Sequence, residues 1–143
     1  MNLKPEEISV RELLPHRGRA VMIDALLEAG PAGGAAAKTF RAGDYGLVGE
    51  TVCETALVEC VAQATAAIFG YERLKNPGES GLGFLAALSA FSFGRPARVD
   101  EPLRIEVRID RILGPMCIVG GRVLAGGELV AGGEIKIYLQ SKV

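Results

Sequence analysis

The segment from Thr55 to Phe69 constrains the fold most, because it is long, almost entirely apolar and lacks a broad polar face. A helix on a protein surface carries a polar stripe, so we expect this helix to be enclosed by a sheet. Glu59 lies in the middle of the segment, and an ionised carboxylate is costly to bury without a partner. Thr55, Glu59 and Gln63 are four residues apart and therefore follow one line along the helix.

Two explanations of Glu59 remain open at this point. In the first, a hydrogen bond or an arginine from the sheet neutralises a structural carboxylate. In the second, burial raises the pKa of the Glu59 carboxyl and makes it useful as a general acid or base. Periodicity alone does not separate the two.

The composition predicts one domain over residues 1–143, because a chain of 143 residues buries one core and is too short for two. A formal net charge of -1 with scattered basic residues does not indicate a nucleic-acid or membrane partner. The N-terminal residues lack the apolar core of a signal peptide, so we expect a soluble, cytoplasmic protein.

Cysteine, histidine and glycine limit the chemistry further. The three cysteines lack Cys-x-x-Cys spacing and are expected to be reduced thiols. With His16 as the single histidine, His-rich metal sites are excluded and any catalytic histidine pair has to use that residue. The glycines around Gly30 form a turn sequence without a phosphate-loop pattern. No metal and no cofactor are expected.

Around the long helix the pattern predicts strands and turns. We expect a short helix over Ser9 to Leu14, capped by Ser9, and a capping box at Thr51 and Glu54 that starts the long helix. The charged segment Glu72 to Ser80 should end it. Strands are expected at Ala20 to Ala29 (with a helix as the alternative), Ala35 to Phe40, Gly81 to Phe93, Leu103 to Ile112, Cys117 to Ala125 and Glu128 to Gln140, with a loop over Arg41 to Val52. The fold class is therefore α+β, an antiparallel sheet around one helix.

Several short motifs occur in an order that resembles a known family. They are Leu13-Leu-Pro-His-Arg17, Val21-Met-Ile-Asp24, Glu59-Cys-Val-Ala-Gln63, Gly83-Phe-Leu-Ala-Ala87, Phe91-Ser-Phe-Gly-Arg-Pro96 and Asp100-Glu-Pro-Leu-Arg-Ile-Glu-Val107. Together the motifs resemble the hotdog-fold 3-hydroxyacyl-[acyl-carrier-protein] dehydratases from about residue 9 to about residue 139. The resemblance implies a homodimer or an assembly of dimers, an acyl tunnel at the subunit interface and a phosphopantetheine-linked thioester as substrate.

The resemblance also assigns a role to Glu59, as the general acid that protonates the departing hydroxyl. The base of that family, a histidine in a Gly-His-Phe-Pro segment, does not carry over, because this chain has Gly43-Asp44-Tyr45-Gly46 there. Asp44 and Tyr45 are the candidate replacements. His16 matches a Pro-His-Arg that is not catalytic in the family, so we expect it to be structural, in a turn or an interface, with a role in the site as the alternative.

The remaining candidates are substrate-binding residues. Thr55 and Gln63 share the polar line with Glu59, whereas Phe91 and Phe93 suit the core or a tunnel wall. Arg95, with Arg98, is a candidate for the phosphate or the acidic helix of a carrier protein, the alternative being ordinary surface charge.

Three functions follow, in decreasing order of preference. The first is a variant dehydratase in fatty-acid, polyene or polyketide synthesis, whose missing base comes from Asp44, from Tyr45 or from a His-containing hotdog paralogue in a heterodimer. The second is a thioesterase acting on acyl-CoA or acyl-carrier-protein, in which Glu59 activates water or attacks the thioester. The third is a non-catalytic subunit that binds an acyl group or a carrier protein.

Overall fold

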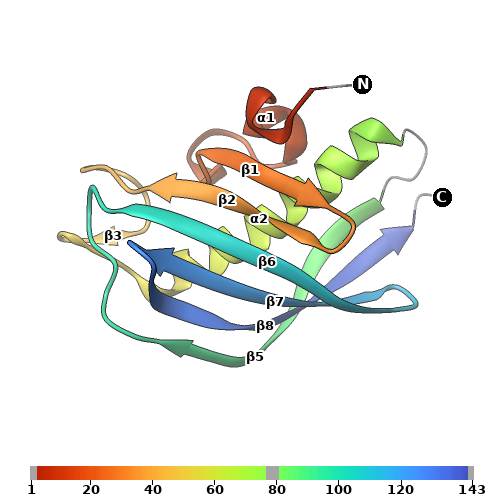
Figure 1. Cartoon of the computed structure of the whole chain (residues 1–143). Coiled ribbons are helices and arrows are strands. Elements are labelled where there is room, and N and C mark those ends of the chain that lie inside the picture. Colours follow the sequence, from red (N-terminus) through yellow and green to blue (C-terminus); the bar gives the residue numbers. More distant parts are fainter. Residues whose placement is uncertain (1–2, 77–80, 142–143) are drawn as a thin grey trace.

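The computed structural model describes residues 3–76 and 81–141, without the side chains of 81–86 and 140–141. One long helix lies against a curved antiparallel sheet with strand order β1-β2-β6-β7-β8-β5 (Figure 1). The helices are η1 (Pro5–Glu7), α1 (Val10–Leu13), η2 (Gly18–Ala20) and α2 (Glu54–Lys75). The strands are β1 (Ala25–Gly30), β2 (Gly33–Thr39), β3 (Leu47–Val48), β4 (Thr51–Val52), β5 (Gly81–Phe93), β6 (Pro102–Leu113), β7 (Met116–Ala125) and β8 (Glu128–Ser141). The predicted α+β architecture is confirmed.

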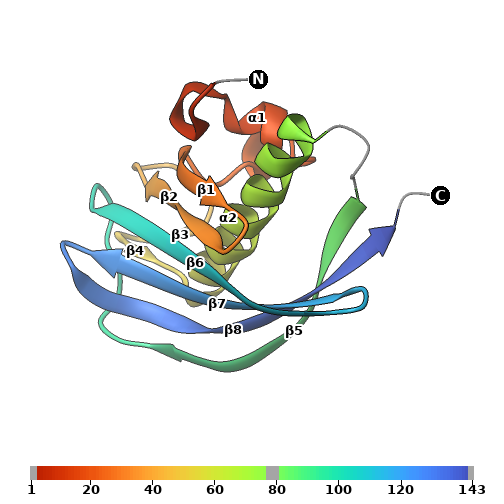
Figure 2. The same ribbon diagram turned by 45° about the vertical axis from the view of Figure 1, so that its right-hand side comes forward.

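The sheet curves around one side of α2 (Figure 2). At one contact the two approach so closely that glycine is required. A Cβ atom at Gly121 of β7 would lie 2.3 Å from Cγ1 of Val61, so only glycine lets the strand approach the helix there. Leu57 and Ile68 are almost fully buried on this side of α2, and each buried side chain of this size contributes about 1.5–3 kcal/mol. The predicted wrapping of the helix follows from these contacts.

The N-terminal residues pack on the opposite side of α2. Ser9 caps α1 by accepting a hydrogen bond from the Arg11 backbone N–H (3.3 Å), as predicted. A Cβ atom at Gly70 of α2 would lie 2.2 Å from the Leu13 carbonyl oxygen, so glycine again allows the close approach. Figure 1 shows α1 beside β1 and the C-terminal half of α2.

The expected loop over residues 41–52 contains the short β3–β4 hairpin, and the expected starts of two longer elements were also wrong. The helix α2 begins at Glu54 after the N-cap Cys53, and Thr51 instead lies in β4, where its hydroxyl donates to the Val48 carbonyl oxygen (3.0 Å). The first long strand begins at Ala25 because the backbone before it bonds to the Gln63 side chain. The expected end of the helix is right as far as Lys75, while residues 77–80 lie outside the described part of the chain.

The second half follows the prediction closely. In β6 the inward Leu103, Ile105 and Val107 are buried and the residues between them are not. The Gly126-Gly127 turn between β7 and β8 has φ values of 57° and 83°, which glycine adopts without strain. Among the residues that the structure describes, no helix is long and apolar enough to cross a membrane.

Candidate functional site

Glu59 lies on a strip of α2 that this chain leaves partly uncovered. Its side chain is 40% exposed, so the expectation of a buried carboxylate was wrong for the single chain. Ala62, Ala66 and Phe69 continue the strip at helical spacing and are also only partly buried. Thr55, one turn before Glu59, is exposed. The carboxylate is therefore accessible on the uncovered strip of the helix.

Gln63 holds Glu59 in place from one turn further along α2. Its Oε1 accepts hydrogen bonds from the backbone N–H groups of Met22 (2.7 Å) and Ile23 (3.4 Å). Its Nε2 donates to the Ala20 carbonyl oxygen (2.6 Å) and to Oε1 of Glu59 (2.9 Å). Gln63 is 1% exposed and both of its amide hydrogens are used. It is thus placed to orient Glu59 and anchor residues 20–23.

His16 faces the same carboxylate from the N-terminal segment. Its Nε2 lies 3.6 Å from Oε1 of Glu59, and its side chain is 30% exposed. Its Nδ1 is turned into the protein and has no hydrogen-bond partner among the described residues. Nε2 is therefore the imidazole nitrogen directed toward Glu59.

Asp44, one of the two expected bases, is engaged elsewhere. Its Oδ2 accepts a hydrogen bond from the Arg41 backbone N–H (2.8 Å) and lies 3.6 Å from Nζ of the buried Lys38. Nζ of Lys38 also lies 3.5 Å from Oδ1 of Asp24. The Arg41 N–H and the Lys38 ammonium hold the pKa of the Asp44 carboxyl below its ordinary value, against an opposing effect of burial. A lowered pKa makes Asp44 a weaker base.

The environment of Asp44 predicts a pH dependence of stability. A carboxyl whose pKa is lower in the folded than in the unfolded state contributes stability above its unfolded pKa of about 3.9, and that stability is lost as pH falls through the folded pKa. We expect Asp44→Asn to lower Tm by a few degrees at pH 7, and the difference from the wild type to shrink below about pH 4. Thermal melts of both proteins between pH 7 and pH 2.5 measure this, and a constant difference would contradict it.

The other groups near these loops differ in accessibility. Tyr45, the second expected base, is 69% exposed. It lines a cavity of about 160 Å³ together with Lys38 and Asp44, whereas Glu59 and His16 do not line that cavity.

Cys60 adjoins Glu59 in the sequence but is completely buried, and burial raises the pKa of its thiol to about 12. Cys60 is thus unsuited to act as a nucleophile.

The model of the ApeP-like family, described as ApeP dehydratase, matches residues 8–143. The chain belongs to the ApeP-like dehydratase family. A search of curated proteins finds no match to the sequence.

Solved structures give the same fold for this ApeP-like chain. A chain of the dehydratase heterocomplex ApeI:P from Xenorhabdus doucetiae is 16% identical with a TM-score of 0.81, the match covering 94% of this chain and 93% of that one. A hypothetical thioesterase from Streptococcus pneumoniae TIGR4, solved with coenzyme A, is 9% identical with a TM-score of 0.65, covering 82% and 85%. The PaaI protein from the phenylacetic acid degradation operon of E. coli is 14% identical with a TM-score of 0.65, covering 79% and 80%. Identities this low show the hotdog fold alone.

The expected substrate-binding residues of the ApeP-like chain are not gathered at Glu59. Phe91 and Phe93 are half-buried neighbours, with ring centroids 5.7 Å apart, packed against the core. The Thr55 hydroxyl lies 3.4 Å from Sγ of Cys53 at the start of α2. Of the expected set, Gln63 is the residue with a direct hydrogen bond to Glu59.

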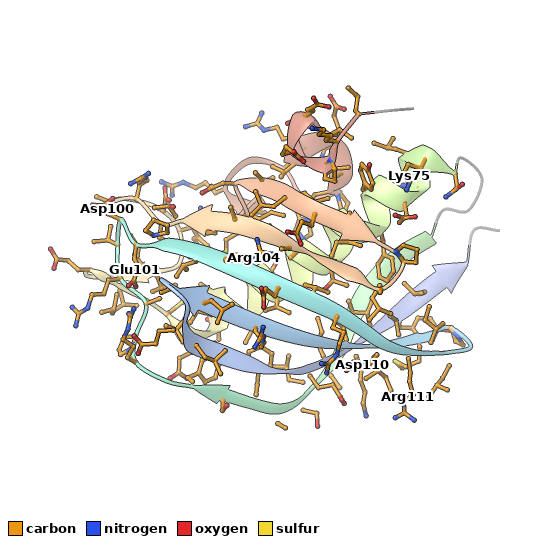
Figure 3. The ribbon with its side chains drawn as sticks, viewed as in Figure 1. Lys75, Asp100, Glu101, Arg104, Asp110 and Arg111 are labelled. Atoms are coloured by element: carbon orange, nitrogen blue, oxygen red, sulfur yellow. The ribbon has the colours of Figure 1, made fainter. Side chains whose placement is uncertain are left out.

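Arg95 is bound by carboxylates of its own chain. It donates to Glu101 through Nη1 (3.1 Å) and Nη2 (2.7 Å) and to Glu128 through Nε (3.1 Å). Glu101 lies in the loop that leads into β6 (Figure 3). The Arg95 guanidinium holds the pKa of Glu101 below its ordinary value. Arg95 therefore fastens this loop to β8, and a phosphate would have to compete with two carboxylates for it.

A cavity of about 1000 Å³ lies on the face of the sheet that is turned away from α2. Its walls include charged residues of β6 and β7, among them Arg104, which Figure 3 labels on β6. Arg104 is paired with Glu28 (3.1 Å) and Glu106 (3.0 Å). Neither His16 nor Glu59 contributes to this cavity, so it is separate from the candidate site.

The sequence predicts a structural His16, in a turn or an interface, with a role in the site as the alternative, and the structure places its imidazole beside Glu59. Its approach to Glu59 across 43 residues of sequence is a tertiary contact that no local pattern contains.

Proposed function

We propose that this chain acts on acyl thioesters and eliminates water from 3-hydroxyacyl groups carried on a phosphopantetheine arm, with Glu59 as the general acid. The observation that carries the proposal is the accessible Glu59 carboxylate, fixed through Oε1 by Gln63 in a member of the ApeP-like dehydratase family. None of the described residues donates a hydrogen bond to Oε2 of Glu59, so that oxygen is available to a substrate hydroxyl.

The chemistry needs a proton donor and a proton acceptor. The hydroxyl leaves C3 with the electrons of the C3–O bond and takes a proton from Glu59, giving water. The electrons of the C2–H bond form the C2=C3 double bond, and the C2 proton passes to a base. A positioned acid or base of this kind typically contributes a 100- to 10,000-fold rate enhancement.

Hydrolysis of the thioester is the second candidate. An accessible carboxylate on a hotdog helix can also activate water or attack the thioester carbonyl, and a hypothetical thioesterase is among the structures with this fold. The two reactions release different products, since hydrolysis frees a thiol and dehydration keeps the thioester intact.

We further propose that a second hotdog subunit covers the strip of α2 that carries Glu59. The similar ApeI:P assembly is a heterocomplex, and the strip of Ala62, Ala66 and Phe69 is left partly uncovered by this chain. The second subunit is either another copy or a hotdog paralogue. To distinguish a homodimer from a heterodimer, this chain is co-expressed with the hotdog proteins encoded next to its gene. The size and composition of the purified complex are then measured.

The test of function is turnover of crotonyl thioesters of coenzyme A and of an acyl carrier protein. A dehydratase run in reverse removes the enoyl absorbance by adding water, whereas a thioesterase releases free thiol. We expect loss of enoyl absorbance without thiol release. Binding of both thioesters without either reaction would contradict the enzymatic proposal and favour a non-catalytic binding subunit.

A further inference from the structure

We propose that His16 is the general base that works opposite Glu59, so that one chain carries both proton-transfer groups. This proposal rests on the proposed dehydration. Nε2 of His16 lies 3.6 Å from Oε1 of Glu59, and both side chains are partly exposed. Catalytic hydrogen bonds are often longer before a substrate binds than in the reacting complex. The pair therefore has a geometry in which both groups can reach one small substrate.

Contacts on both sides of His16 hold it against α2. Before it, the Leu13 carbonyl lies on Gly70, at a distance that excludes a side chain at that position. After it, the Ala20 carbonyl and the Met22 N–H are bonded to Gln63. The imidazole is thus carried by a short segment fixed at both ends to the helix that presents Glu59.

The turn at His16 is itself locked by its neighbour. Nη1 of Arg17 donates to the carbonyl oxygens of Leu14 (2.8 Å) and His16 (2.7 Å), which fixes the backbone on both sides of Pro15. Positioned catalytic groups lose less entropy on reaction than mobile ones. The rigid turn suits a base that has to meet one C–H bond.

The two nitrogens of the imidazole are not equivalent. Nδ1 is turned into the protein without a partner among the described residues, whereas Nε2 faces the partly exposed carboxylate. A base has to be reached by the proton it accepts, so Nε2 is the atom that takes the C2 proton. Asp44, in contrast, is bound by the Arg41 N–H and the Lys38 ammonium, and Tyr45 borders that same cluster.

The same two residues also account for the return of the proton after each turnover. Dehydration leaves a proton on His16 and removes one from Glu59, so the site has to move one proton back before the next turnover. With Nε2 and Oε1 3.6 Å apart, the imidazolium passes its proton to the carboxylate directly or through the product water. A histidine on a second subunit is therefore not needed, whichever hotdog subunit completes the acyl site.

The test is chemical rescue of His16→Ala. Removing the base should lower hydration of crotonyl thioester by about 100-fold or more. Added imidazole should restore part of the activity, and more basic substituted imidazoles should restore more. Because proton removal becomes the slow step, dehydration of a C2-deuterated 3-hydroxybutyryl thioester should show a larger isotope effect in the variant. Thermal melts check that the fold persists, and His16→Gln, which keeps polar bulk, should stay inactive.

The outcomes separate this proposal from the proposed function. His16 is not the base if His16→Ala keeps activity within about threefold of the wild type. The same conclusion follows if the variant melts normally but imidazole does not restore its activity. In both cases the proposed dehydratase function is unaffected. If the wild type has no dehydratase activity alone or with a hotdog partner, the proposed function fails and this proposal with it. The NMR signals of the single histidine give an independent readout, because a 3-hydroxyacyl thioether analogue should shift them in the wild type. Unchanged signals with the analogue bound would overturn the placement of His16 at the substrate.

Discussion

Replacing Glu59 by glutamine is expected to lower hydration of crotonyl thioester by about 100- to 10,000-fold, while Tm changes little. An amide has the shape of the carboxyl group but no proton of suitable acidity for the departing hydroxyl. The fold should tolerate the change because Glu59 is 40% exposed and its amide oxygen still accepts the hydrogen from Gln63. Steady-state kinetics and thermal melts of wild type and variant measure both effects.

Glu12→Gln is the matched control for this substitution. Glu12 lies exposed on α1, so the same chemical change there leaves the candidate site intact and should leave turnover unchanged. Equal activity of Glu59→Gln and wild type would make Glu59 a structural residue and remove both enzymatic candidates. Loss of thioesterase activity with no dehydratase activity in the wild type would instead favour hydrolysis.

The burial of α2 shows what the sequence pattern can and cannot predict. The absence of a broad polar face correctly predicted a helix enclosed by a sheet, as Leu57 and Ile68 confirm. The same pattern made Glu59 look buried, because Ala62 and Ala66 are apolar as well. Hydrophobic periodicity marks a surface that avoids water, but it does not say whether the same chain or a second subunit covers it.

The errors at the start of α2 and of β1 have a common physical origin. Thr51 has the residue type of an N-cap, yet pairing of β3 with β4 directs its hydroxyl to Val48. The residues before Ala25 have a strand-like sequence, yet their backbone bonds to Gln63 from the helix. At Thr51 the strand pairing is supported by the Val52 N–H, which donates to the distant Ala97 carbonyl (2.8 Å), and before Ala25 the bonds come from Gln63. In both cases long-range bonds prevailed over a local preference of about 1 kcal/mol or less. The approach of His16 to Glu59 depends on the bonds from Gln63.

Gln63→Leu should reduce both stability and turnover. Leucine fills a similar space but leaves the buried Met22 N–H without its acceptor, whereas the carbonyl of the exposed Ala20 can bind water instead. An unsatisfied buried backbone N–H costs about 1–3 kcal/mol, so the free energy of unfolding should fall by about that amount. Denaturant titrations measure this loss, with the slope checked against the wild type.

The effect of Gln63→Leu on kcat distinguishes a positioning role from general destabilisation. In this variant Glu59 loses the donor that fixes Oε1, and the segment that carries His16 loses its attachment at Ala20. We therefore expect kcat to fall by a larger factor than KM rises, even at temperatures where the variant is fully folded. Thr65→Val is the matched control on the same helix, because the buried Thr65 hydroxyl bonds only to the Val61 carbonyl of its own helix among the described residues. That variant should lose about 1 kcal/mol or less and keep its kcat. Equal losses of kcat in both variants would mean that helix stability, not the orientation of Glu59 by Gln63, limits turnover.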